Sequence, residues 1–135
     1  MPEKQMIISI DNWHGVYSNE ESFDLTNPDT LLRCINDLNG KNKTSVALTH
    51  DEEIYMVIGG GNEGKYSVVG GINGQIYNLI NKNNINKKGY VQIVTGGQLG
   101  DFEMKYCVDK EMAIQAANHF YKNIDFDKTL KWEIL

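Results

Sequence analysis

Between residues 44 and 94 the chain alternates short apolar segments with glycine-rich turns, and this spacing constrains its fold more than any other feature. Apolar residues stand at alternate positions or in short blocks, as they do in β-strands. The clearest segments are residues 46–48, 54–58, 66–68 and 76–80. Such short connections favour antiparallel pairs, because a parallel pair needs a crossover of roughly a dozen residues or more. The spacing therefore predicts an antiparallel meander rather than βαβ units.

The glycine clusters at residues 59–64 and 70–74 are typical of tight hairpin turns, which need positive φ angles. A phosphate-binding loop is the functional alternative for the first cluster. That cluster lacks the Gly-Lys-Ser/Thr ending of a P-loop, and the residues that follow it resemble a strand rather than a helix. Hairpin turns are therefore the better interpretation of both clusters.

Residues 27–40 predict the first helix. Asn27 is a good N-cap, Pro28 suits the first helical position, and Asp29 faces the positive end of the helix dipole. Gly40 is a natural C-terminal stop. A one-sided apolar stripe runs through Leu31, Leu32, Ile35 and Leu38.

Residues 109–122 predict a second helix, with Asp109 as its cap, Glu111 in its first turn and Lys122 near its end. Small alanines on one face would let this helix lie close to a sheet. The face consists of Met112, Ala113, Ala116, Ala117, Phe120 and Tyr121.

The remaining segments complete an α+β fold, with a mainly antiparallel sheet and two packed helices, in a single domain spanning residues 1–135. Residues 6–10 predict the first strand, and residues 11–26 form a long loop or a short hairpin. Residues 81–88 are expected to be an exposed loop. We expect residues 90–94 to resume the sheet, followed by a turn through residue 103, a short strand at 104–108 and a last strand at 130–134.

Composition narrows the class of protein. No apolar run approaches the roughly 20 residues of a membrane helix, and the start of the chain is too short in apolar residues for a secretory signal. We therefore expect a cytoplasmic protein. The formal net charge of −5 argues against nucleic-acid binding, since such proteins need Lys and Arg to neutralise phosphates. An acidic surface is better suited to a basic partner, whose approach it accelerates.

The sequence contains no strong catalytic or metal-binding motif. His14, His50 and His119 are widely spaced, and Cys34 and Cys107 are expected to be free thiols whose redox role the sequence leaves open. The segment 50–53 offers ligands for a hard metal, but a solvated acidic turn is the better interpretation. We therefore expect no metal, no cofactor and no enzymatic activity.

Acidic residues cluster at 20–21, 51–53, 101–103 and 125–127. Solvated loop charge is the simplest interpretation, general acid–base chemistry is another, and docking against basic residues of a partner is the one we favour. Trp13 stands in a polar segment, where it either covers the core or anchors an interface. Trp132 is expected to fill the core from the last strand.

The order of motifs over residues 44–135 resembles the first-numbered immunity-protein family of bacterial polymorphic-toxin systems. The resemblance lies in the strand, glycine-rich turn and strand at mid-chain, and in four later motifs. These are Thr-Gly-Gly at 95–97, Val-Asp-Lys-Glu-Met-Ala at 108–113, Ala-Ala-Asn-His-Phe-Tyr at 116–121 and Leu-Lys-Trp-Glu at 130–133. The family commonly has a Gly between the final helix and the Trp strand, where this chain has Lys-Asn-Ile-Asp at 122–125.

This resemblance implies a protein without catalytic activity that binds and blocks a cognate toxin domain, such as a nucleic-acid deaminase or nuclease, encoded by a neighbouring gene. Loop-borne acids and an aromatic residue would then contact a basic toxin. The candidates for partner binding are Trp13, Glu20, Glu21, Asp51, Glu52, Glu63, Asp101 and Glu103. The alternatives are a peptide- or ligand-binding module that uses an exposed sheet edge, and a small carboxylate-dependent enzyme.

Overall fold

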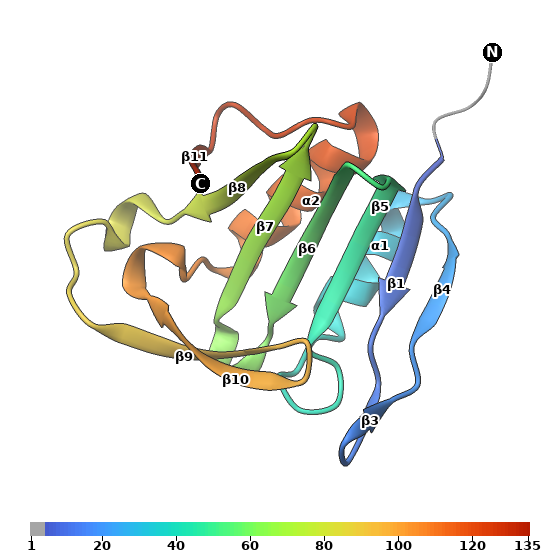
Figure 1. The fold of residues 1–135 in the computed structure, drawn as a ribbon, viewed down its shortest axis with the longest axis horizontal. Helices are drawn as coiled ribbons and strands as arrows, with labels where there is room; N and C mark the ends of the chain where they lie inside the picture. Colours follow the sequence, from blue (N-terminus) through green and yellow to red (C-terminus); the bar gives the residue numbers. More distant parts are fainter. Residues whose placement is uncertain (1–4) are drawn as a thin grey trace.

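A seven-stranded antiparallel sheet forms the centre of the structure, with strand order β11-β8-β7-β6-β5-β1-β4 (Figure 1). The computed structural model describes residues 5–135. The predicted absence of a secretory signal concerns the start of the chain, and residues 1–4 of that segment lie outside the described residues. The strands are β1 (Ile7–Ile10), β4 (Glu21–Asp24), β5 (Ser45–Asp51), β6 (Ile54–Gly60), β7 (Tyr66–Ile72), β8 (Gln75–Ile80) and β11 (Lys131–Ile134). The predicted α+β class and the meander from β5 to β8 are confirmed.

Both predicted helices form, and they cover one face of the sheet (Figure 1). In α1 (Pro28–Asn36), the Asn27 side chain accepts a hydrogen bond from the Asp29 amide at 2.7 Å. In α2 (Lys110–Asn123), Asp109 accepts one from the Met112 amide at 2.8 Å. Each bond satisfies an amide that has no partner within its own helix, which fixes where the helix begins.

The first helix is shorter than predicted, because it ends at Asn36 and not at Gly40. The Asn39 side chain accepts hydrogen bonds from the amides of Lys41 and Lys43, and this turn starts a new direction for the chain. Gly40 lies inside the turn with a φ of +71°. The glycine therefore serves the turn that follows the helix.

The core lies between the helices and alternate residues of the central strands. Ala113, Ala116 and Ala117 are fully buried and let α2 approach β6 and β7 closely, as predicted. The buried strand residues on the helix-covered face of the sheet include Ile8, Val46, Leu48, Met56, Ile58, Val68 and Leu79. Trp132 adds to one side of the core: its ring stacks on Phe126 with centroids 4.7 Å apart. Each large side chain buried in this way stabilises the fold by about 1.5–3 kcal/mol.

The prediction that residues 90–94 return to the main sheet is wrong. Strand β9 (Tyr90–Thr95) pairs only with β10 (Gln98–Glu103), and this separate hairpin crosses the face of the sheet opposite the helices (Figure 1). The predicted turn at residues 101–103 is accordingly a strand. Gly59 explains the placement, because a Cβ atom there would lie 2.1 Å from Oγ1 of Thr95. The missing side chain makes room for the hairpin on top of β6.

Two other connections differ from expectation. Residues 104–106 form a 3₁₀ turn instead of a strand, and only Val108 bridges to β7, through Tyr66. The predicted exposed loop at 81–88 contains a buried residue, Asn84, whose amide nitrogen donates to the carbonyls of Met104 and Cys107. These side chain–backbone bonds join two turns that local sequence patterns do not connect.

The segment 11–26 forms the short hairpin that was one of the two alternatives. Strands β2 (Trp13–His14) and β3 (Tyr17–Ser18) pair with each other, and the chain then forms the edge strand β4, which was not predicted. All four β4 residues are exposed. Alternation is hard to see in β4 because its side chains have little contact with the core.

Replacing Gly59 with alanine tests how the hairpin is seated. We expect the variant to lose about 1–3 kcal/mol of unfolding free energy, because the added methyl group collides with Thr95. Urea denaturation of wild type, Gly59→Ala, Thr95→Gly and the double variant would measure the loss. The double variant should be about as stable as Thr95→Gly alone. Fully additive losses would contradict this packing.

Candidate functional site

A buried carboxylate, Asp11, organises the end of the sheet that carries the hairpin. Its Oδ1 accepts hydrogen bonds from the amides of Thr44 at 2.7 Å and Ser45 at 2.9 Å. Its Oδ2 accepts from the Trp13 indole at 2.8 Å and from the Thr44 hydroxyl. Burial alone would raise the pKa of this carboxyl, but the bonds from Thr44, Ser45 and Trp13 outweigh it and lower the pKa below its usual value.

Trp13 extends this network to the β9–β10 turn. Its ring covers Gly97 so closely that a Cβ atom there would lie 2.3 Å from Cε2 of the indole. The Gly97 amide in turn donates to the Thr44 hydroxyl at 2.9 Å. Trp13 is half-buried, its N–H is bound within the chain, and its ring lies over Gly97 of the β9–β10 turn. Its part in binding a partner stays a prediction.

The sheet register separates the predicted acids into different places. Glu21 pairs with Ile10 on β4, which makes it an edge-strand residue rather than a loop residue, and Glu20 immediately precedes it. Asp51 ends β5 and Glu52 follows in the turn, at the opposite end of the sheet. All four are exposed. They do not form one cluster, although they share one side of the molecule.

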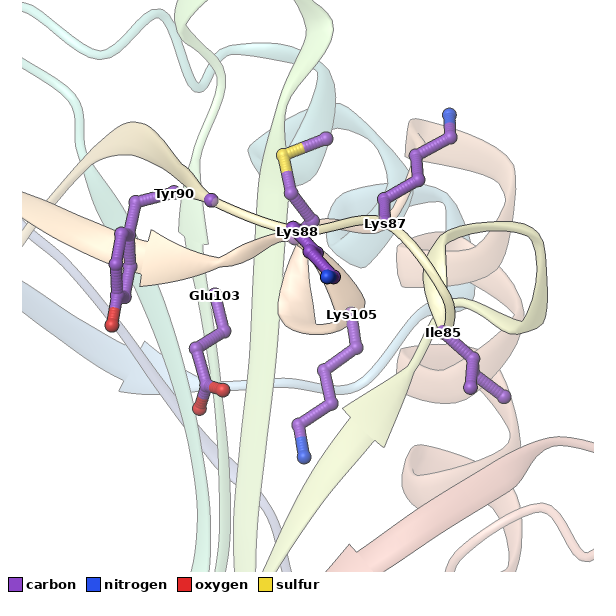
Figure 2. Close-up of a pocket in the computed structure, with 8 residues that line it drawn as sticks. Ile85, Lys87, Lys88, Tyr90, Glu103 and Lys105 are labelled. Atoms are coloured by element: carbon purple, nitrogen blue, oxygen red, sulfur yellow. The ribbon is translucent and has the colours of Figure 1, made fainter.

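Asp101 and Glu103 lie on β10, where the sequence predicted a turn. Both are exposed, and being two residues apart they share one face of the hairpin. Glu103 also lines a pocket of about 300 Å³ between the hairpin and the loop before it, together with Lys87, Lys88 and Lys105. Figure 2 shows the ends of these three lysines pointing in different directions. Their ammonium groups therefore do not converge on one bound anion.

Lys105 is already engaged at this pocket. Its Nζ lies 3.0 Å from Oε2 of Glu133, and Oε1 of the same carboxylate accepts a hydrogen bond from the Tyr106 hydroxyl at 2.7 Å. Glu133 raises the pKa of Lys105, and the bonds from Tyr106 and Lys105 lower the pKa of Glu133. This set of contacts fixes β11 to the turn at 104–106, which is a structural role.

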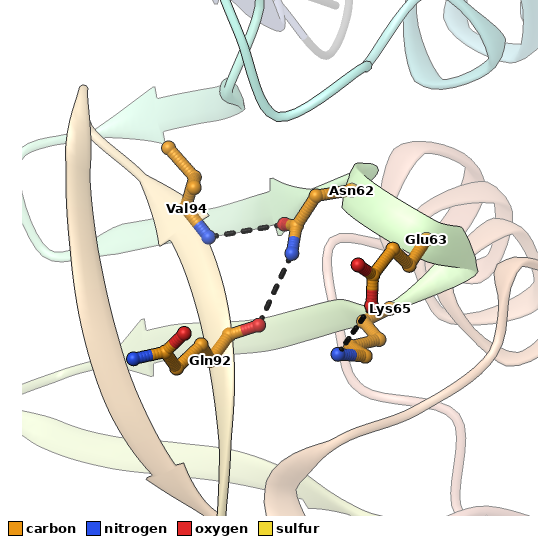
Figure 3. Close-up of polar contacts among 5 residues, drawn as sticks. All are labelled: Asn62, Glu63, Lys65, Gln92 and Val94. Carbon is orange, nitrogen blue, oxygen red and sulfur yellow. Dashed lines mark hydrogen bonds and ion pairs between the residues drawn. The ribbon is translucent and has the colours of Figure 1, made fainter.

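Glu63 lies in the 3₁₀ turn between β6 and β7 (Figure 3). It is exposed, and Lys65 lies 2.8 Å away and lowers the pKa of its carboxyl. The neighbouring Asn62 holds the hairpin: its Nδ2 donates to the Gln92 carbonyl and its Oδ1 accepts from the Val94 amide, both at 3.1 Å. Glu63 is therefore exposed to solvent beside the hairpin, and Lys65 partly neutralises its charge.

Charge is unevenly distributed along the chain and across the sheet. Residues 5–64 carry ten acidic and three basic residues, whereas residues 65–135 carry seven acidic and nine basic residues. The first group builds α1 and the strands β4, β1, β5 and β6, which are neighbours at one side of the sheet (Figure 1). The second group builds the other side and the hairpin. One side of the molecule is thus strongly acidic, and the other is slightly basic.

The residues with nucleophilic or metal-binding chemistry are scattered. Within residues 5–135, no group of three or more His, Cys, Asp and Glu side chains is placed to hold a metal ion. Cys34 is buried and Cys107 is half-buried, and burial raises the pKa of both thiols. Thiols in such surroundings are poor nucleophiles. None of the helices in the described part of the chain is both long and apolar enough to cross a membrane.

No protein-family model matches the chain, and no curated protein matches it. The resemblance to immunity proteins therefore rests on the order of its sequence motifs.

Replacing Asp11 with asparagine tests the buried network. Either orientation of the amide places an N–H₂ group against two donors, so we expect the unfolding free energy at pH 7 to fall by about 2–3 kcal/mol. A lowered pKa stabilises the fold above the usual carboxyl pKa of 3.8, and this contribution disappears as the pH falls through the folded-state value. The variant should therefore lose less stability on acidification than wild type.

Urea denaturation at pH 7 and at about pH 3 would measure both effects. Asp24→Asn is the matched control, since Asp24 is an exposed carboxylate on β4. Equal effects of the two substitutions would contradict a special role for Asp11.

Proposed function

We propose that this protein is an immunity protein that acts in the bacterial cytoplasm, where it binds a cognate toxin domain and blocks the toxin's active-site cleft. The observation that carries the proposal is the separation of charge, with the acids gathered on the side formed by β4, β1, β5 and β6. The order of motifs over residues 44–135 supports the same class of protein.

The charge separation suits a basic partner. Enzymes that act on nucleic acid bind phosphates through Lys and Arg, so their clefts attract carboxylates as well. An acidic face accelerates the encounter with such a cleft and discourages partners that are themselves acidic. Glu20, Glu21, Asp51 and Glu52 are the exposed acids on this side that we expect to take part.

The direct experiment is to express the protein together with the toxin domain encoded by the neighbouring gene. We expect growth to be rescued and the two proteins to co-purify. A toxin that kills equally well in the presence of this protein, with no complex formed, would refute the proposal.

Neutralising acids should slow the encounter with that toxin domain. We expect the Glu20→Gln, Glu21→Gln double variant to associate several-fold more slowly at low salt, because long-range attraction sets the association rate. The difference should shrink between about 50 and about 500 mM salt, as screening increases. Stopped-flow fluorescence or surface plasmon resonance would measure both rates.

The matched control neutralises two cations on the other side of the molecule, Lys87→Gln with Lys88→Gln. That variant should associate as fast as wild type or faster. Slowing by the lysine substitutions instead would indicate an acidic partner.

A further inference from the structure

The face of the sheet opposite the helices contains two rows of side chains that lie outside the area crossed by the β9–β10 hairpin. Residues paired across antiparallel strands share a face, so the register defines each row. The first row is Asp24, Ile7, Thr49, Tyr55, Gly71 and Ile76. The second row is Ser22, Ser9, Ala47, Val57, Val69, Asn78 and Glu133. We call these thirteen residues the open face.

The β9–β10 hairpin ends where the open face begins. The next row along the sheet contains Ser45, Gly59 and Ser67, and Thr95 of the hairpin lies directly over Gly59. Figure 1 shows the hairpin crossing this end of the sheet and leaving the rest of the face clear. The hairpin thus forms a wall along one side of the open face.

The centre of the open face is apolar. Ala47, Val57 and Val69 are neighbours in the second row, and all three are half-buried. In the first row, Ile7 and Ile76 are 43% and 40% exposed. An antiparallel sheet with one face in solvent ordinarily shows polar residues there. The apolar centre at Ala47, Val57 and Val69, with Ile7 and Ile76 exposed towards its two sides, therefore indicates an interaction surface.

Acidic residues border this apolar centre at the end away from the hairpin. A pocket of about 180 Å³ opens there, lined by Glu52, Glu53, Tyr55 and Ile76 together with Gly71, Gly74 and Gln75. The Tyr55 ring lies against Gly71, where a Cβ atom would be 2.5 Å from Cε1. Two carboxylates beside an aromatic ring form a favourable environment for a guanidinium or ammonium group. Asp24 continues the acidic border on β4.

We propose that the open face is the surface on which the basic toxin domain docks, with an apolar patch of the toxin on Val57 and Val69 and one of its Arg or Lys side chains in the pocket beside Glu52. This inference rests on the proposed function and specifies its surface. An apolar centre with a charged rim is the usual anatomy of a protein interface. The acidic rim sets the chemistry of the partner, because only a cationic surface is complementary to it.

The test is binding of the toxin domain to variants of the open face. Ile76→Lys places a charge on the open face at an exposed position beside the pocket, so the fold should tolerate it. We expect it to weaken the equilibrium affinity roughly tenfold or more, since it brings a cation against a basic partner. Leu99→Lys is the matched control: Leu99 is 60% exposed on β10, outside the open face. That variant should bind like wild type.

A second pair of variants tests the pocket. Glu52→Lys replaces a negative charge at the pocket with a positive one. Glu111→Lys makes the same change of charge on the exposed surface of α2. Isothermal titration calorimetry should show a loss of roughly tenfold or more for Glu52→Lys and little change for Glu111→Lys. Equal affinities across both pairs would overturn the proposal while leaving the immunity function in place. Absence of any complex with the wild-type protein would instead refute the proposed function.

Methyl NMR of the wild-type protein gives a readout that does not depend on any variant. On addition of the toxin domain, the methyl signals of Val57, Val69 and Ile76 should shift, while those of Leu99 and Leu32, which lie elsewhere on the surface, should not. Shifts confined to residues outside the open face would overturn the proposal. So would a homodimer in the absence of toxin that Ile76→Lys dissociates, because the face would then be occupied by a second copy of the chain.

Discussion

The hydrogen bonds to the Asp11 carboxylate are the interaction on which the arrangement of this fold most depends. They join the end of β1 to the start of β5 through Thr44 and Ser45, and to the hairpin through Trp13. A carboxylate removed from water is costly unless its oxygens are satisfied, and here both accept two donors. The hydrogen bonds that satisfy the Asp11 carboxylate therefore also hold β1, the start of β5 and the β9–β10 hairpin together at one end of the sheet.

The sequence predicted the elements whose signals are local. Asn27 and Asp109 cap their helices as expected, and the meander from β5 to β8 follows from hydrophobic spacing and glycine turns. The position of the β9–β10 hairpin does not follow from the sequence, because strand periodicity does not indicate which strand is the partner. Its position depends on the contact between Gly59 and Thr95, and these residues are far apart in sequence. The burial of Asn84 was not predictable for the same reason, since its side chain donates to a carbonyl about twenty residues later in the sequence.

The candidate binding residues were predictable as exposed charges, but their grouping was not. Register places Glu21 and Asp51 at opposite ends of the sheet, and β10 turns Asp101 and Glu103 into strand residues. The apolar open face was also hidden in the sequence, because a strand such as β6 is apolar on both faces. Only the position of the helices and the hairpin distinguishes the core face from the uncovered one.

The hydrogen bond between Thr44 and Gly97 has a consequence for how the chain folds during synthesis. Asp11 and Thr44 are separated by 33 residues, and Thr44 and Gly97 by 53. The amino-terminal strands therefore emerge from the ribosome well before Gly97, the residue that the Trp13 ring covers. Contacts of such long range slow folding, because the intervening chain must first be ordered. We therefore expect the acidic side of the molecule, although it is synthesised first, to complete its hydrogen bonds only after the hairpin has been made.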